Sequence, residues 1–125
     1  MGRRNRAIGI TGELIALEFL KKKGYEILDT NYRTPFGEID IIAMHGDCTV
    51  FVEVKTRATC SLGPPYLAVT RAKQRHMIKN ALSYLTRRGL VNSSWRFDVV
   101  SIRLDFASEI ESIELIENAV EDYNY

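Results

Sequence analysis

The feature that most constrains this chain is a pair of strand-like segments joined by a tight-turn signal. Residues 38–44 and 48–56 are rich in β-branched side chains, and the short linker between them contains Gly46. This pattern is typical of a β-hairpin whose two-residue turn has glycine in its first position. In such a turn His45 pairs with Cys48. Because every further pair follows in step, this one pair predicts the register of the whole hairpin.

The predicted register divides the hairpin into an apolar face and a partly charged face. The apolar face is uninterrupted and is therefore expected to face the core: Ile39, Ile41, Ala43, Val50, Val52 and Val54. At the open end of the other face, Asp40 is predicted to lie opposite Glu53. Glu38 is predicted to lie opposite Lys55. Two facing carboxylates repel each other, so the stability of the hairpin alone does not favour this arrangement.

A divalent cation would remove the repulsion between Asp40 and Glu53. Carboxylate oxygens suit Mg²⁺ or Mn²⁺, which complete their coordination with water and with the phosphate of a substrate. Lys55 lies two residues from Glu53 on the same face, where an ammonium can orient a water or stabilise charge on a transferring phosphate. The alternative interpretation is a surface cluster of ion pairs that binds no ligand.

A helix is expected over residues 8–23, with Gly24 where a C-terminal cap belongs. At about 100° per residue, Glu13 points in the same direction as Ala16, Leu17 and Leu20, the stripe expected to pack on the sheet. A carboxylate in that stripe needs a partner, and the predicted metal cluster is the nearest candidate. The alternative is that Glu13 lies at the edge of the stripe and reaches water. The small size of Gly12 predicts close packing of the helix backbone.

The remaining pattern predicts a single domain over residues 1–125. The further elements expected are strands over 25–31, 96–104 and 112–116 and a second helix over 70–88, with Thr70 as its N-cap and Gly89 at its end. The order is αβββαβ followed by a last strand. This order indicates an α/β fold with one mixed sheet and helices packed on it.

Three segments together carry a resemblance to a known class of enzymes. The helix containing Glu13, the segment Gly37–Asp40 and the segment Phe51–Arg57 resemble the PD-(D/E)XK motif of restriction-endonuclease-like nucleases, especially archaeal Holliday-junction resolvases. The chain as a whole resembles the YraN family of small uncharacterised bacterial proteins. The resemblance implies a restriction-endonuclease-like αβββαβ core. One departure is Ile39, which occupies the place of the proline before the motif aspartate.

The resemblance also implies roles for individual residues. Asp40, Glu53, Glu13 and the backbone carbonyl of Val54 would bind Mg²⁺ or Mn²⁺, and Lys55 would be the catalytic lysine. The implied enzyme is a metal-dependent endonuclease that hydrolyses phosphodiester bonds in DNA, with branched and single-stranded forms among its substrates. The resolvases imply that two subunits pair as a homodimer. The alternative is a nucleic-acid-binding or protein-interaction module that keeps the nuclease fold without efficient catalysis.

The charge distribution favours a polyanionic partner. Residues 1–90 contain 15 Lys and Arg against 8 Asp and Glu, whereas residues 91–125 contain 2 against 8, so the net charges are +7 and −6. Basic side chains are frequent in the second helix, and Arg71, Gln74 and Arg75 are predicted to point toward the acids. The candidate DNA contacts are Arg57, Arg71, Lys73, Gln74, Arg75 and Lys79. A basic helix that is simply solvated is the alternative.

Other features exclude some classes of protein. Cys48 and Cys60 lack the spacing of a zinc site and are expected to be free thiols. No apolar run approaches the length of a membrane span, so a cytoplasmic protein without membrane contact is expected. Asp98, inside a predicted strand, is either a buried hydrogen-bonded acid or an outer neighbour of the metal site, and we favour the first interpretation.

Overall fold

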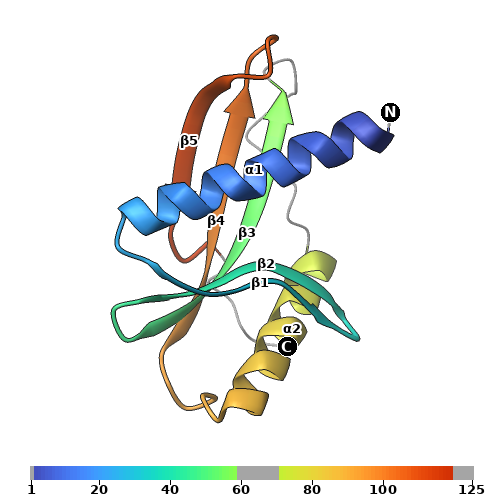
Figure 1. Ribbon diagram of the computed structural model, residues 1–125. Helices are drawn as coiled ribbons and strands as arrows, with labels where there is room; N and C mark the ends of the chain where they lie inside the picture. The colour runs from blue at the N-terminus through green and yellow to red at the C-terminus, as the bar shows by residue number, and fades with distance from the viewer. Residues whose placement is uncertain (1, 59–70, 120–125) are drawn as a thin grey trace.

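The computed structural model describes residues 2–58 and 71–119, with side chains from residue 12 onward in the first segment and from residue 72 onward in the second. The elements are α1 (Gly2–Lys22), β1 (Glu26–Thr34), β2 (Gly37–His45), β3 (Cys48–Ala58), α2 (Arg71–Arg88), β4 (Trp95–Leu104) and β5 (Ile110–Ile116). The five strands form one sheet in sequence order, in which β3 and β4 are parallel and the other pairs are antiparallel (Figure 1). The predicted α/β fold with a restriction-endonuclease-like αβββαβ arrangement is confirmed.

The hairpin register is confirmed at the turn and wrong at the open end. His45 pairs with Cys48, and Gly46 has the positive φ of 62° that the first position of the predicted turn requires. The ladder between β2 and β3 ends at the pair of Ile41 with Val52. Figure 1 shows β1 and β2 turned away from the direction of β3 and β4. The predicted pairing of acids beyond Ile41 therefore does not form, because the two strands diverge there.

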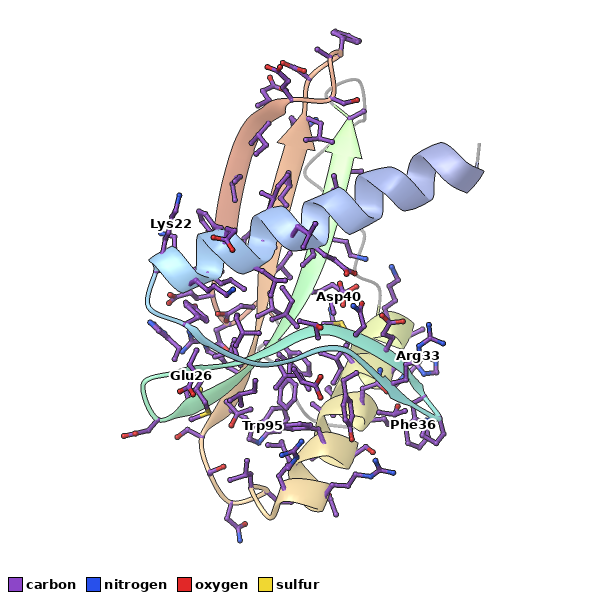
Figure 2. All side chains as sticks on the ribbon, in the orientation of Figure 1. Lys22, Glu26, Arg33, Phe36, Asp40 and Trp95 are labelled. Atoms are coloured by element: carbon purple, nitrogen blue, oxygen red, sulfur yellow. The ribbon has the colours of Figure 1, made fainter. Side chains whose placement is uncertain are left out.

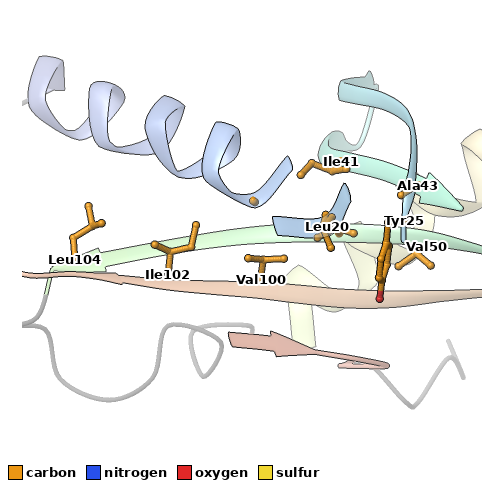
Figure 3. Packing of buried hydrophobic residues seen from close by; sticks show 10 residues of the cluster. Leu20, Tyr25, Ile41, Ala43, Val50, Val100, Ile102 and Leu104 are labelled. Atoms are coloured by element: carbon orange, nitrogen blue, oxygen red, sulfur yellow. The ribbon is translucent and has the colours of Figure 1, made fainter. Parts of the chain in front are cut away.

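Two apolar clusters hold the helices against opposite faces of the sheet. The cluster beneath α1 contains Ala16, Leu20, Tyr25, Ile41, Ala43, Val50, Val52, Val100, Ile102 and Leu104 (Figure 3). The cluster beneath α2 contains Ile39, Ile42, Phe51, Ile78, Ala81, Tyr84, Leu85 and Phe97. Ile39 was predicted on the face of Ile41, and this was wrong because β2 twists where it leaves β3. The acids at this twist therefore lie between the apolar cluster beneath α1 and the apolar cluster beneath α2.

Both helices end as predicted. Gly24 has a φ of 90°, and the Tyr25 N–H donates to the Leu20 carbonyl while the Gly24 N–H donates to the Lys21 carbonyl. Gly89 closes α2 in the same way, with a φ of 67°. Neither described helix is both long and apolar enough to cross a membrane. Thr70, the predicted N-cap of α2, lies outside the described residues.

Some element bounds differ from those expected. β1 continues three residues beyond Asn31, past a bulge near Leu28 and the positive φ of 51° at Asn31 itself. A bulge and a residue such as asparagine interrupt the alternation of side chains, so the sequence pattern predicted that the strand ends at Asn31. α1 begins at Gly2 rather than Ile8, because the preceding basic residues include no helix-breaking residue that would stop it. Cys48 is a free thiol, as expected, and Cys60 lies outside the described residues.

Asp98 belongs to the frame of the fold and not to the acid cluster. It is fully buried and accepts hydrogen bonds from the Tyr25 hydroxyl at 2.8 Å, the Arg96 Nε at 2.9 Å and the Asn118 N–H at 3.0 Å. A buried carboxylate with this many donors is well compensated. The favoured interpretation of Asp98 as a hydrogen-bonded structural acid is confirmed.

Candidate functional site

Carboxylates from two elements meet where β2 separates from β3. Glu13 of α1 and Glu38 and Asp40 of β2 each place one carboxylate oxygen within 4.8 Å of the others. Glu13 reaches this place because Ala16 and Leu20, on the same side of α1, are buried against the sheet. Glu53 of β3 is a neighbour of these three acids, and its charge raises the pKa of both Asp40 and Glu13. Figure 2 shows Asp40 between α1 and α2.

Close packing of α1 on β3 fixes the position of Glu13. A Cβ added at Gly12 would collide with the hydroxyl oxygen of Thr56 and would lie 3.3 Å from its Cβ. Only glycine allows the helix backbone to approach this closely. The predicted reason for Gly12 is confirmed, and the residue beside it is the acid of the cluster.

The electrostatic environment of Asp40 opposes its charged form. Burial, followed by the charge of Glu53, raises the pKa of Asp40 to about 7, although its carboxylate accepts a hydrogen bond from the Val54 N–H at 2.8 Å. Burial also raises the pKa of Glu13, and the charges of Glu38 and Glu53 act in the same direction. Protein groups therefore compensate this acid cluster only in part.

Asn31 supplies one polar partner that the sequence did not reveal. In the amide orientation that its surroundings require, its nitrogen lies 2.7 Å from Glu38 Oε1 and 3.2 Å from Glu13 Oε2. The backbone of Asn31 has a positive φ of 51°, a conformation that non-glycine residues rarely adopt and that is often found at functional sites. Its amide thus bridges the acids of α1 and β2.

Two lysines flank the acids. Lys55 Nζ lies 3.2 Å from Glu53 Oε1, and the two side chains are only 17% and 22% exposed. Lys73 of α2 lies next to Lys55, and the interaction with this neighbouring ammonium, followed by partial burial, lowers the pKa of Lys73. Acids from the sheet and ammonium groups from the sheet and α2 therefore face each other across a short distance.

Glu38, Glu53 and the two lysines line an open cleft of about 150 Å³ between the sheet and α2, and Asp40 and Glu13 lie beside Glu38 at its edge. Its lining residues are Phe36, Gly37, Glu38, Glu53, Lys55, Lys73, His76, Met77 and Asn80. Hard carboxylate oxygens of this kind fit Mg²⁺ or Mn²⁺, which also take water and phosphate oxygens as ligands. The raised pKa of Asp40 is consistent with a cluster that needs a cation to be fully compensated.

The structure brings together four of the residues predicted from the motif. Glu13, Asp40, Glu53 and Lys55 converge as described. Val54 lies next to Glu53 and donates its N–H to Asp40, while a ligand role for its carbonyl stays a prediction. Glu38 was assigned a place opposite Lys55, and instead it lies with Glu13 and Asp40 because the ladder ends before it.

The predicted DNA contacts of α2 are only partly in place. Lys73 lines the cleft, but Gln74 is half-buried and Arg75 is exposed, and neither contributes to the cleft lining. The α2 face turned to the acids instead carries His76 and Asn80, which the sequence interpretation missed. Lys79 lies over the ring of Phe36, at 5.5 Å from its centroid. The side chain of Arg71 lies outside the described residues.

Comparison with known proteins shows which family the chain is similar to. The sequence model of the uncharacterised protein family UPF0102 matches residues 12–102, a range that includes the four acids and both lysines. A UPF0102 protein of Caldicellulosiruptor saccharolyticus is 47% identical over 91% of this chain and 97% of its own length. One from Geobacter sulfurreducens is 45% identical over 94% and 91% of the two chains, and one from Pelobacter propionicus is 50% identical over 94% and 84%.

Proposed function

The chain belongs to the uncharacterised protein family UPF0102, the YraN family that its sequence resembles, and we propose that it is a metal-dependent nuclease that hydrolyses phosphodiester bonds in DNA. The observation that carries the proposal is the convergence of Glu13, Glu38 and Asp40 beside an open cleft that is lined by Glu38, Glu53 and the ion-paired Lys55. Carboxylates that lie this close together repel each other, and such clusters are typical of sites where a bound ligand compensates their charge. The choice of phosphodiester hydrolysis as the reaction rests on the resemblance to PD-(D/E)XK nucleases.

The acids would hold a divalent cation. We assign Asp40, Glu53 and Glu13 to it, with Glu38 as a further oxygen donor that the structure adds to the sequence prediction. The Val54 carbonyl is the remaining ligand that the resemblance implies. When bound, Mg²⁺ or Mn²⁺ polarises a phosphoryl oxygen and lowers the pKa of a coordinated water.

Lys55 acts on the reacting phosphate through its charge. Its ion pair with Glu53 holds the ammonium in the cleft at low exposure, where electrostatic interactions are stronger than in water. From this position it can orient the attacking water and stabilise the charge that develops on the phosphate oxygens. Lys73 adds a second positive charge from α2 and suits a contact with a neighbouring phosphate.

DNA is the polyanion that the charge distribution favours. The sheet order places β5 at the opposite edge from β1 and away from the cleft, and the exposed acids in and beside β5 are Glu109, Glu111, Glu114 and Glu117. The basic residues proposed to position the DNA backbone are Arg57, Lys73 and Lys79, together with Arg71, Gln74 and Arg75 from the sequence prediction. Contacts of this kind give affinity without reading the bases.

The test separates catalysis from binding by replacing Lys55. We expect Lys55→Ala to lower the rate of metal-dependent cleavage of branched or single-stranded DNA by about 100-fold or more, because it removes charge stabilisation in the transition state. Affinity for the same DNA in metal-free buffer should change far less. Lys21→Ala, which removes an exposed lysine of α1, is the control for loss of one positive charge.

A second variant distinguishes the lysine from the metal ligands. Glu53→Ala should also lose cleavage, and excess Mn²⁺ should restore part of it, whereas Mn²⁺ should not restore Lys55→Ala. The proposal fails if the wild-type protein cuts no form of DNA with either metal. It also fails if Lys55→Ala cuts at the wild-type rate.

A further inference from the structure

Phe36 is an exposed aromatic residue at the edge of the cleft. It lies in the turn between β1 and β2, is 45% exposed and contributes to the lining of the cleft beside Glu38 and Lys73 (Figure 2). We propose that the Phe36 ring stacks on an unpaired nucleobase, so that the substrate presents single-stranded nucleotides to the acids. This inference rests on the proposed function and specifies its substrate class.

The turn that carries Phe36 is fixed to α2. The Phe36 N–H donates to the Thr34 hydroxyl oxygen at 3.0 Å, and that hydroxyl is hydrogen-bonded to the side chain of Asn80. Asn80 is buried, and its amide nitrogen lies 3.2 Å from where a Cβ of Gly37 would stand. The φ of 139° at Gly37 favours glycine and sets the direction of the chain after Phe36. A ring on such a fixed turn binds a ligand with little loss of entropy.

The surroundings of Phe36 supply the charges that a nucleic-acid strand needs. Lys79 Nζ lies 5.5 Å from the ring centroid, and Lys55 and Lys73 lie in the same cleft. Proteins that bind single strands combine aromatic rings for the bases with cationic side chains for the phosphates. In a continuous duplex the faces of the bases are already stacked on each other. The ring can therefore gain a base contact only where a base is unpaired.

Exposure alone does not make a phenylalanine a base-stacking residue, and Phe106 is an example. Phe106 is 86% exposed in the turn between β4 and β5, close to the acidic residues Asp105 and Glu109. Single exposed apolar side chains are normal on protein surfaces. Phe36 differs because it is fixed by α2, is accompanied by lysines and lines the cleft of the acid cluster.

The test measures binding of the full chain in metal-free buffer, where the acids cannot support cleavage. Fluorescence anisotropy would compare a single-stranded oligonucleotide, a blunt duplex and a strand of the same length made of abasic nucleotides. We expect Phe36→Ala to weaken binding of the single strand by about 5- to 100-fold, the effect of losing one stacked base. Binding of the abasic strand should be unchanged, because it retains the phosphates and has no bases. Binding of the duplex should change far less than that of the single strand, because only the outer faces of its two end pairs are free.

Two further variants keep the result interpretable. Phe36→Trp should retain the affinity for the single strand, whereas Phe36→Leu, which keeps an apolar side chain, should lose it. Phe106→Ala should have no effect and serves as the matched control. The stacking inference is overturned if Phe36→Ala weakens all three ligands equally or none of them.

Cleavage is scored separately from stacking. Metal-dependent cleavage by a Phe36→Ala variant with unchanged affinities would overturn the stacking role and leave the nuclease proposal intact. Conversely, a selective loss of single-strand affinity in a protein that cuts no DNA would support the stacking role and defeat the nuclease. If the wild-type protein binds none of the three oligonucleotides, the stacking role is overturned, and the nuclease proposal is judged by metal-dependent cleavage alone.

Discussion

Asp40 is the residue at which the chemistry of the site can be tested without a substrate. Its carboxylate accepts one hydrogen bond, from Val54, while burial and the charges of Glu53 and Glu13 oppose ionisation. The folded-state pKa of about 7 is above the ordinary value near 4. A raised pKa contributes stability that is complete below about pH 4 and is lost as the pH rises through 7. At pH 8 the metal-free protein therefore bears the full cost of the buried charge.

Asp40→Asn should remove that cost. We expect the free energy of unfolding at pH 8 without metal to rise by about 1–3 kcal/mol, and its decline between pH 5 and 8 to become shallower. Urea denaturation at several pH values measures both effects. Mn²⁺ should raise the melting temperature of the wild type by mass action and that of the variant much less. Glu18→Gln, an exposed acid of α1, is the control, and parallel pH profiles for Asp40→Asn and the wild type would contradict the prediction.

At the residue scale, the sequence identified the site residues that lie in regular helix or strand. It misplaced or missed the residues whose position depends on irregular backbone. Helical spacing identified Glu13, and strand alternation with the motif identified Asp40, Glu53 and Lys55. Glu38 was misplaced because a ladder extrapolated from the turn cannot reveal where two strands diverge. Asn31 was missed because its role depends on a positive φ that no local sequence pattern specified.

At the scale of elements, the contact of α1 with β3 sets the geometry of the acid cluster. Gly12 approaches Thr56 so closely that the next residue, Glu13, is held over the open end of β2 and β3. A methyl group at residue 12 would push the helix away from the sheet or displace the stiff, β-branched side chain of Thr56.

Gly12→Ala should therefore destabilise the protein although alanine is the better helix former. We expect the free energy of unfolding to fall by about 1–3 kcal/mol, the usual effect of overpacking, and the rise in melting temperature with Mn²⁺ to shrink as Glu13 moves. Removing the obstructing atoms in Gly12→Ala/Thr56→Ala should restore part of both. If the double variant is as unstable as the sum of the two single variants, the two residues do not interact and Thr56 does not limit how closely α1 approaches β3.

The orientation of α2 shows a limit of helical-wheel arguments. The apolar stripe was predicted correctly, since Ile78 and Leu85 are buried against the sheet. Gln74 and Arg75 were predicted to point toward the acids, but the polar side chains of α2 that line the cleft are Lys73, His76 and Asn80. A wheel gives relative directions, but the side of the stripe that faces the cleft depends on where the sheet places its open end. The turn before Gly37, which docks on Asn80, was not foreseen for the same reason.

At the scale of the whole molecule, one buried acid ties together distant parts of the chain. Asp98 of β4 binds Tyr25, the residue that follows the cap of α1, and Asn118, which follows β5. Arg96 forms an ion pair with Asp98 and contacts His45 Nδ1 at 3.0 Å, at the turn of the β2–β3 hairpin. The network joins the segment after α1, the end of β2, β4 and the segment after β5, so its loss should affect global stability and not the cleft.

Asp98 is fully buried and Asp40 is half-buried in the same sheet, and the difference in their partners predicts opposite responses to the same substitution. Asp98→Asn places an amide against the donors of Tyr25, Arg96 and Asn118 and should lower the free energy of unfolding at pH 8 by about 2–4 kcal/mol. The rise in melting temperature with Mn²⁺ should persist, because Asp98 is not among the acids of the cluster. Denaturation of both variants with and without Mn²⁺ measures this contrast. A carboxylate that is fully compensated by protein donors has no need of a cation. If Asp98→Asn stabilised the protein or abolished the metal response, Asp98 would therefore not be a purely structural acid, and its distinction from the ligand-binding Asp40 would be wrong.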